Sequence, residues 1–354
     1  MGDYPRLLID LNRIQHNAKT ITSLASRYGM SVTGVTKATC GDPKIAEAML
    51  KGGVTSIGES RIENIVKLKE AGVHAEMMFL RTPMLSEVKK VVNYADISLN
   101  SELTVISRLS KEAIKKGVKH RIILMVDMGE LREGVVKKEL HPTINKVLTH
   151  KGIELFGVGM NLTCLTGVIP TKAKIKEFDS VVREIEDQVG TELKMVGGGN
   201  SANIPLLLEG HPKSKINNLR IGEGILLGLE AVHRTPIPHT YQNAFTLEAE
   251  IIELKEKPSV PDGENTQNAY GENKTFKNIG TIKRAILGIG RQDVIVDGLK
   301  PVCGFKILES SSDHIVGYNT PPNTKIGDIL QFKPDYGALV NLFTSNYVHK
   351  EYIE

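Results

Sequence analysis

Short apolar runs that stop at a polar or charged residue recur along the chain up to residue 221. Runs of this kind, bounded by glycine, aspartate or proline, are typical of buried strands. Most segments between them carry apolar residues at helical spacing, as residues 11–25 do before the first run. Eight strands are predicted in succession: residues 31–36, 54–58, 77–80, 95–99, 122–126, 155–160, 193–196 and 219–221.

Eight consecutive strand–helix units predict a (β/α)8 TIM barrel. A doubly wound open sheet has the same alternation, and periodicity alone does not exclude it. The polar residues at the strand ends favour the barrel, because its strands converge with their carboxyl ends on one mouth, where active sites are built.

The pattern changes near Thr235-Pro236-Ile237-Pro238, which indicates a linker. Residues 245–254 then alternate like a half-buried strand, and residues 255–277 predict a long exposed loop. Further short strands are predicted at residues 281–287, 294–296, 302–308, 315–317 and 328–332. We therefore predict a barrel domain over residues 1–235 and a mostly β domain over residues 236–354.

Composition restricts the class of partner. The 354 residues are 40% hydrophobic, and the 45 basic and 41 acidic residues leave a net charge of +4. This balance does not argue for nucleic acid or a membrane surface, and no apolar stretch reaches the length of a membrane span. The cysteines, Cys40, Cys164 and Cys303, form no CxxC pair, which suits a reducing cytoplasm and predicts no zinc site. We expect a cytoplasmic protein.

Lys37, at the end of the first predicted strand, is an unusual residue for that place. Burying an ammonium is costly unless it is paired or used, and a buried lysine favours the free amine that forms Schiff bases. The alternative is a lysine whose ammonium extends from the strand end into water. This stretch by itself favours the exposed lysine, but the rest of the chain reverses that preference and leads us to expect a buried one.

The segment Gly197-Gly198-Gly199-Asn200-Ser201 follows the seventh strand, and Gly222-Glu223-Gly224 follows the eighth. Glycines let a backbone approach an anion, and the loops after strands seven and eight are the usual phosphate site of such barrels. A phosphate there and a lysine on the first strand suggest pyridoxal 5′-phosphate (PLP), held through its aldehyde by the lysine amine.

With this lysine and these two glycine-rich strand ends, the chain resembles the fold-type III PLP enzymes, above all the alanine racemases and their relatives. Residues 35–43, Val-Thr-Lys-Ala-Thr-Cys-Gly-Asp-Pro, are most similar to the ornithine racemase branch. The resemblance covers nearly the whole chain. It implies that Lys37 is the Schiff-base lysine and one of two catalytic bases. It also implies that Arg220 faces the pyridine nitrogen and, because arginine keeps its proton, leaves that nitrogen unprotonated.

The resemblance also implies further contacts. Arg132 would touch a cofactor oxygen and the substrate carboxylate. Two positions depart from the family: Asn161 stands where alanine racemases carry a histidine against the cofactor ring, and Gly41 where they carry a tyrosine on the phosphate. The implied phosphate region consists of Asn200, Ser201, Gly222, Glu223 and Tyr347.

A racemase needs a second acid/base group on the opposite face of the substrate. In alanine racemases this group is a tyrosine from the partner in a head-to-tail homodimer, and the matching residue here is Tyr270. Residues 310–314 match the partner-side segment that faces the substrate, with small serines such as Ser312. Asp313 in that segment either pairs with a distal ammonium, as ornithine or lysine would bring, or caps a turn.

Other readings stay open. An alanine, lysine or broad-range racemase would use the same scaffold. A related decarboxylase also uses a Gly-Gly-Gly loop, but it carries a Cys-Asp-Ser-like segment and places an acidic residue where Arg220 stands. Residues 58–64 resemble a non-catalytic PLP carrier family, which lacks a second domain. We expect an ornithine racemase.

Overall fold

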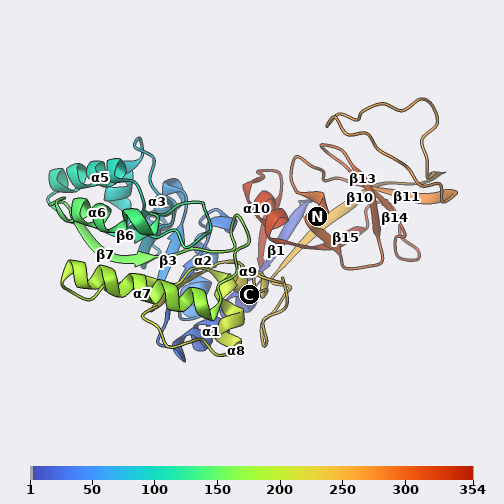
Figure 1. Cartoon of the computed structure of the whole chain (residues 1–354). Coiled ribbons are helices and arrows are strands. Elements are labelled where there is room, and N and C mark those ends of the chain that lie inside the picture. The colour runs from blue at the N-terminus through green and yellow to red at the C-terminus, as the bar shows by residue number, and fades with distance from the viewer. Residues whose placement is uncertain (1–2, 354) are drawn as a thin grey trace. The chain divides into compact units, whose positions relative to one another are not determined.

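The computed structural model describes residues 3–353, which form two compact units (Figure 1). The barrel unit spans Leu11–Gln242. The β unit combines the residues up to Asp10 with those from Asn243 onward.

Eight parallel strands close into a barrel in the barrel unit, in the order β2 to β9. The pairing of β2 with β9, in which Val32 lies opposite Leu219, closes the barrel and rules out the open-sheet alternative. The eight predicted strands are therefore confirmed. They are β2 (Ser31–Val35), β3 (Ser56–Glu59), β4 (Glu76–Phe79), β5 (Ile97–Asn100), β6 (His120–Met125), β7 (Ile153–Gly159), β8 (Met195–Gly197) and β9 (Asn218–Ile221).

Helices follow the strands and cover the outside of the barrel (Figure 1). Local chemistry sets several of their ends. Asp42 accepts a hydrogen bond from the Ile45 N–H at the start of α2, and Thr171 accepts one from Lys174 N–H at the start of α7. The helices are α1 (Leu11–Ser26), α2 (Pro43–Lys51), α3 (Ile62–Glu70), α4 (Val88–Tyr94), α5 (Leu103–Lys116), α6 (Lys137–Leu148), α7 (Lys172–Val189), α8 (Ile204–Glu209) and α9 (Glu223–Leu227).

A cluster of buried apolar side chains from neighbouring strands fills part of the barrel core: Met78, Ile97, Leu99, Ile123 and Met125. Burying each such side chain contributes roughly 1.5–3 kcal/mol. A barrel filled by side chains is a packed core and has no pore, so chemistry is confined to the loops at the carboxyl ends of the strands.

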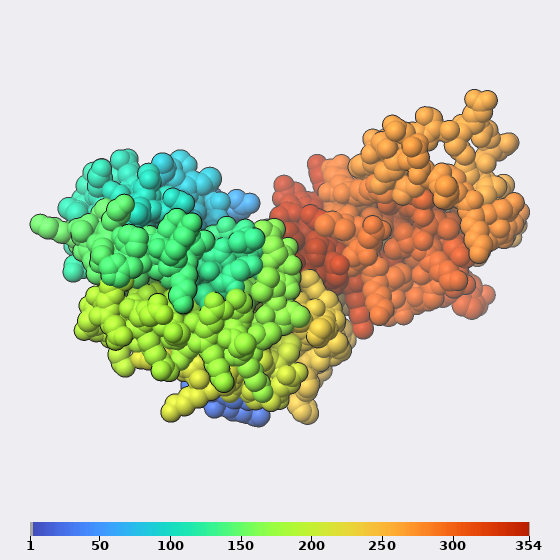
Figure 2. Space-filling model, viewed as in Figure 1, coloured from blue at the N-terminus to red at the C-terminus, as the bar shows by residue number. Residues whose placement is uncertain are grey.

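The β unit is mostly antiparallel, in the order β12-β15-β10-β11-β14-β13. Its loop of residues 259–280 stands out from the rest of the unit (Figures 1 and 2). The elements are β1 (Arg6–Asp10), β10 (Phe245–Pro258), β11 (Thr281–Leu287), β12 (Leu299–Pro301), β13 (Lys306–Ser310), β14 (Ile315–Tyr318), β15 (Ile329–Pro334), α10 (Tyr336–Thr344) and β16 (His349–Ile353).

The two units divide the chain differently from the predicted domains 1–235 and 236–354. Strand β1 at the N-terminus pairs antiparallel with β10 and parallel with β16, so it belongs to the β unit. The Arg6 guanidinium also binds the Glu248 carboxylate at 2.6 Å and the Glu351 carboxylate at 2.7 Å. The sequence around β1 could not predict this assignment, because both partner strands of β1 lie far away in the chain.

Three local expectations in the β unit were wrong. Residues 294–296 form no strand, because Val296–Gly298 is a 3-10 helix. Of residues 302–308, only 306–308 belong to a strand, β13, and residues 302–305 form no strand. The exposed loop begins later than predicted, because β10 continues to Pro258 by pairing with β11. Within residues 3–353, no helix combines the length and apolar character that a membrane span needs.

His120, at the start of β6, gives the fold a measurable sensitivity to acid. The ring is 3% exposed and shares a 2.8 Å hydrogen bond with the Ser98 hydroxyl. Burial, with the neighbouring Arg121 charge, lowers the pKa of His120 from 6.5 to about 4. Between those values the unfolded chain binds a proton that the folded protein excludes, so acidification favours unfolding.

We expect the free energy of unfolding to fall by about 2 kcal/mol between pH 7 and pH 5 from this residue alone. Urea unfolding of wild type and His120→Gln at both pH values measures it, because the variant should lack that share of the decrease. His74→Gln, which changes an exposed histidine, serves as the control. Equal pH dependence in wild type and His120→Gln would contradict the assignment.

Candidate active site

Arg220, on β9, places a buried charge at the mouth of the barrel. It is 6% exposed, and its Nη2 donates to the Met160 carbonyl at 2.7 Å. Burial lowers the pKa of Arg220 to about 10; the charge of Glu133 opposes this lowering and that of Arg132 adds to it. The guanidinium therefore stays charged at neutral pH, as the family resemblance implies.

Packing requires glycine at each position of the Gly197-Gly198-Gly199 run. A Cβ on Gly197 would lie 2.5 Å from Arg220 Nη1, and one on Gly198 would lie 2.6 Å from the Ile216 side chain. Gly199 has a φ of +115°, which side-chain-bearing residues rarely adopt. These glycines were expected to admit an anion, and the role of Gly197 in accommodating Arg220 has no signal in the local sequence.

Asn200 and Ser201 join the loops that follow β7, β8 and β9. The Asn200 Oδ1 accepts from Ala202 N–H at 2.8 Å, and its Nδ2 donates to Asn161 Oδ1 at 3.1 Å and to the Leu162 carbonyl at 2.8 Å. The Ser201 hydroxyl accepts from Gly224 N–H at 3.1 Å. These bonds hold the three loops in one arrangement around the mouth.

Asn161 leaves a donor unused. Its Nδ2 is buried and has no hydrogen-bond partner within the described chain. A buried amide N–H₂ without a partner costs about 1–3 kcal/mol, so a ligand acceptor at this place would be stabilised. This orphaned donor, next to the residue whose carbonyl holds Arg220, is what a bound polar cofactor would satisfy.

Gly222 and Glu223 lie where β9 runs into α9. A Cβ on Gly222 would lie 3.2 Å from the Val35 Cβ, so this glycine permits close packing against the end of β2. The Glu223 side chain is buried and ion-paired with Arg234. Its carboxylate is thus engaged within the fold, so any anion held by these two residues would be bound through their backbone N–H groups.

The expectation that Lys37 is buried was wrong. Strand β2 ends at Val35, and Lys37 begins a 3-10 turn (Lys37–Thr39) in which its side chain is exposed. The preceding Thr36 is buried and donates from its hydroxyl to Glu59 Oε1 at 3.2 Å. Because the backbone leaves the barrel wall one residue before Lys37, the amine reaches solvent at the mouth without a burial cost.

Glu59, at the end of β3, anchors the Lys37 turn. It is fully buried, and burial raises the pKa of its carboxyl despite hydrogen bonds from Asn64, Ser60 N–H and Thr36. Asn64 also explains Gly41, since a Cβ on Gly41 would lie 2.7 Å from the Asn64 Cβ and the Gly41 φ is +59°. The family's tyrosine has no room at this position.

The loop of residues 127–134 after β6 carries Arg132. The Arg132 guanidinium forms two hydrogen bonds with the Glu133 carboxylate, and this pairing raises its pKa. The buried Glu130 accepts from Thr163 N–H at 2.9 Å and from Thr166 N–H at 3.2 Å. Glu130, which no sequence motif singled out, therefore ties this loop to the loop after β7.

Tyr270, in the exposed loop of the β unit, is 47% exposed but not loosely held. The Arg291 guanidinium lies 4.5 Å from its ring centroid. Arg291 also donates to Glu272 at 3.0 Å and to the Ser310 hydroxyl at 2.8 Å. Arg291, another residue missed in the sequence, thus joins the Tyr270 turn to the 310–314 segment, and both belong to one part of the β unit.

Asp313 and Ser312 lie at the exposed tip of that segment, where the Ser312 hydroxyl donates to the Asp313 carboxylate at 2.7 Å. Tyr347 also belongs to the β unit and is 69% exposed. The candidate residues thus divide between the units. The mouth of the barrel unit carries Lys37, Arg132, Asn161, Asn200, Ser201, Arg220, Gly222 and Glu223.

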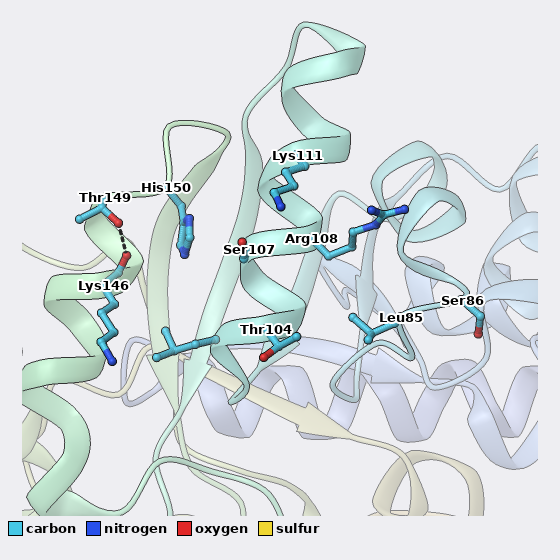
Figure 3. Close-up of a pocket in the computed structure, with 10 residues that line it drawn as sticks. Leu85, Ser86, Thr104, Ser107, Arg108, Lys111, Lys146, Thr149 and His150 are labelled. Atoms are coloured by element: carbon cyan, nitrogen blue, oxygen red, sulfur yellow. Dashed lines mark hydrogen bonds between the residues drawn. The ribbon is translucent and has the colours of Figure 1, made fainter.

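A separate cleft of about 830 Å³ lies on the outer helices α5 and α6 (Figure 3). Arg108 and Lys111 line it from α5, and Lys146 lines it from α6 (Figure 3). It contains none of the residues described above. Because none of the candidate residues lines it, this cleft is not the candidate active site.

We expect Gly197→Ala to lower the free energy of unfolding by about 1–3 kcal/mol, because the added methyl group displaces a buried guanidinium. Denaturant unfolding measures the effect. In an Arg220→Lys background the same substitution should cost less, since the Nη1 atom that it meets is gone. An equal cost in both backgrounds would show that the collision with Arg220 is not the cause.

Comparisons with known proteins agree on one family. Residues 9–229 match the family model described as alanine racemase, N-terminal domain. The chain is 40% identical to the lysine racemase of Thermotoga maritima, over 99% of this chain and 98% of that protein. It is also 40% identical to the ornithine racemase of Acetoanaerobium sticklandii, over 98% of this chain and 99% of that protein.

The fold is likewise that of a solved relative. The structure of alanine racemase from Bartonella henselae with covalently bound pyridoxal phosphate superposes with a TM-score of 0.76 at 18% identity, covering 99% of this chain and 100% of that one. The family model matches more than half of the chain. The protein therefore belongs to the family of the alanine racemase N-terminal domain.

Proposed function

We propose that this protein is a PLP-dependent amino-acid racemase that interconverts L- and D-ornithine. The observation that carries the proposal is the barrel mouth, where an exposed lysine, a buried charged arginine and an unsatisfied buried amide lie at the carboxyl ends of one barrel. The near full-length identity with ornithine and lysine racemases supports the reaction type.

The residues of the mouth fit PLP. Lys37 would hold it covalently through its aldehyde, and Arg220 would face the pyridine nitrogen. Asn161 Nδ2 would donate to it and so satisfy a donor that is otherwise orphaned. Its phosphate would be bound by Ser201 with Asn200, Gly222, Glu223 and Tyr347. When bound, PLP withdraws electrons from the substrate's α-carbon and makes its α-proton removable.

The protein's own groups supply the rest of the reaction. The Arg132 guanidinium binds the substrate carboxylate and orients the α-carbon. The Lys37 amine removes the α-proton from one face, and the Tyr270 hydroxyl delivers a proton to the other. Arg220 stays protonated at neutral pH, so it donates a hydrogen bond without taking up a proton.

Tyr270 is proposed to act on a second copy of the chain. One lysine reaches one face of the α-carbon, so the opposite face needs a group carried by another element. The β unit presents Tyr270 in an exposed loop, held by Arg291 beside the segment with Ser312 and Asp313. A head-to-tail homodimer would bring this loop to a partner's barrel mouth.

Ornithine is the substrate favoured within this class. The small Ser312 leaves room for a side chain longer than that of alanine, and Asp313 offers a carboxylate for a distal ammonium. Lysine is the second candidate, because the relative named lysine racemase has the same identity to this chain as the one named ornithine racemase.

We expect the purified enzyme to racemise L-ornithine with a kcat/KM at least about tenfold above that for L-alanine. Chiral chromatography of reactions with L-ornithine, L-lysine and L-alanine measures it. Turnover of alanine at least as fast as that of ornithine would contradict the proposal. Lysine as the best substrate would favour the second candidate.

A covalent label serves as the control that does not depend on turnover. Borohydride reduction of the holoenzyme followed by peptide mapping should place the cofactor on Lys37. A label on another lysine would end this assignment even if racemisation were observed.

We expect Lys37→Ala and Tyr270→Phe to be inactive singly and to complement each other when coexpressed. A mixed dimer with sites shared between subunits has one intact site, so random assembly restores about a quarter of wild-type activity. Chiral chromatography of the coexpressed protein measures it. No restoration, with mixed dimers verified by differential tags, would place both residues in one subunit or exclude Tyr270 as the second base.

A further inference from the structure

The guanidinium that the proposed mechanism assigns to the substrate carboxylate already holds a carboxylate of the protein. Arg132 Nε and Nη2 each donate to one oxygen of Glu133. The Arg132 side chain is 36% exposed and that of Glu133 is 22% exposed. This is the two-pronged geometry by which arginine binds a single carboxylate. Glu133 therefore occupies the place that a substrate carboxylate needs.

Glu133 belongs to the barrel mouth and is not a remote surface residue. The pKa of the buried Arg220 is lowered mainly by burial, and the charges of Glu133 and Arg132 both act on it. The other two acidic residues of the loop have backbone partners. Asp127 accepts from Gly129 N–H at 2.8 Å, and Glu130 accepts from N–H groups of the next loop. Asp127 and Glu130 thus hold the backbone, whereas Glu133 pairs with Arg132, the proposed binder of the substrate carboxylate.

A substrate carboxylate that binds the Nε–Nη2 edge of Arg132 must displace Glu133 from it. The displaced carboxylate is only 22% exposed, so leaving its charge without a partner costs free energy. Alanine brings a carboxylate to Arg132 but nothing for Glu133. An amino acid with a second ammonium brings a replacement cation in the same molecule, so both ion pairs are restored after binding.

We infer, on the basis of the proposed function, that Glu133 is a specificity-determining residue that exchanges partners when substrate binds. It leaves Arg132 to the substrate carboxylate and then binds the distal ammonium of a diamino acid of the ornithine or lysine class. This assigns selection of the side chain to the barrel unit, in the subunit that carries Lys37. It differs from the assignment to Asp313, which belongs to the β unit.

The inference is tested by binding, separately from turnover. α-Methylornithine and 2-aminoisobutyrate lack the α-hydrogen, so neither can be racemised, and they differ only in the amine-bearing side chain. Calorimetric titration of the PLP-loaded enzyme gives both dissociation constants. In the wild-type enzyme, α-methylornithine should bind at least about tenfold more tightly than 2-aminoisobutyrate. Its distal ammonium gives Glu133 a new ion-pair partner, which 2-aminoisobutyrate does not.

Glu133→Gln should reduce this preference at least about tenfold. It should weaken the binding of α-methylornithine and leave that of 2-aminoisobutyrate equal or tighter, because Arg132 is no longer occupied by a charge. Glu133→Asp, which keeps the charge on a shorter side chain, should move the preference from α-methylornithine towards α-methyllysine. It provides a second test if Glu133→Gln proves poorly folded.

Two further variants complete the experiment. Glu139→Gln, an exposed change in the first turn of α6, is the matched control and should keep the wild-type preference. Asp313→Asn tests the rival carboxylate. If Asp313→Asn abolishes the preference and Glu133→Gln does not, the inference is wrong and the β unit selects the side chain.

Failure of this inference can be distinguished from failure of the proposed function. If wild type racemises ornithine and Glu133→Gln keeps the wild-type binding preference, the inference alone is overturned. If wild type racemises no amino acid, the proposed function is overturned, and the inference falls with it.

Discussion

The buried guanidinium of Arg220 is the interaction on which the barrel mouth depends. Its charge is retained although burial lowers its pKa to about 10, a shift that corresponds to about 3 kcal/mol against the charged form. The Met160 carbonyl offsets part of this cost, and Gly197 provides the space for the guanidinium. The Arg220 guanidinium consequently holds the ends of β7, β8 and β9 together. In the proposed function the same guanidinium would face the pyridine nitrogen of PLP.

The rest of the mouth is built from bonds between loops. Asn200 spans the loops after β7 and β8, and Glu130 connects the loop after β6 to the loop after β7. Thr36 and Glu59 fix the turn from which Lys37 emerges. Side chains held this way are preorganised, which the proposed proton transfers require, because a base must meet the α-carbon at hydrogen-bond range.

The charges at the mouth also bear on substrate choice. Arg132 and Glu133 neutralise each other in the described chain, so in the proposed exchange an incoming amino acid would replace one ion pair with another. Such an exchange favours substrates that carry both charges needed to complete it. The chain is equally similar to an ornithine racemase and a lysine racemase, in line with the proposed recognition of a second ammonium.

Local patterns in the sequence determined the barrel, because strand and helix periodicity repeats within a few residues and the charged and glycine-rich strand ends follow it directly. The same patterns single out Lys37, since a charged residue at the end of an apolar run is visible in the sequence alone, and the family resemblance added Arg220. Only the tertiary structure decided that β1 joins the β unit and that Lys37 is exposed. It alone also decided that Glu133 pairs with Arg132 and that Arg291 stacks on the Tyr270 ring. Strand pairing, exposure and side-chain contacts are set by which segments meet in space, and no local pattern of residues carries that information.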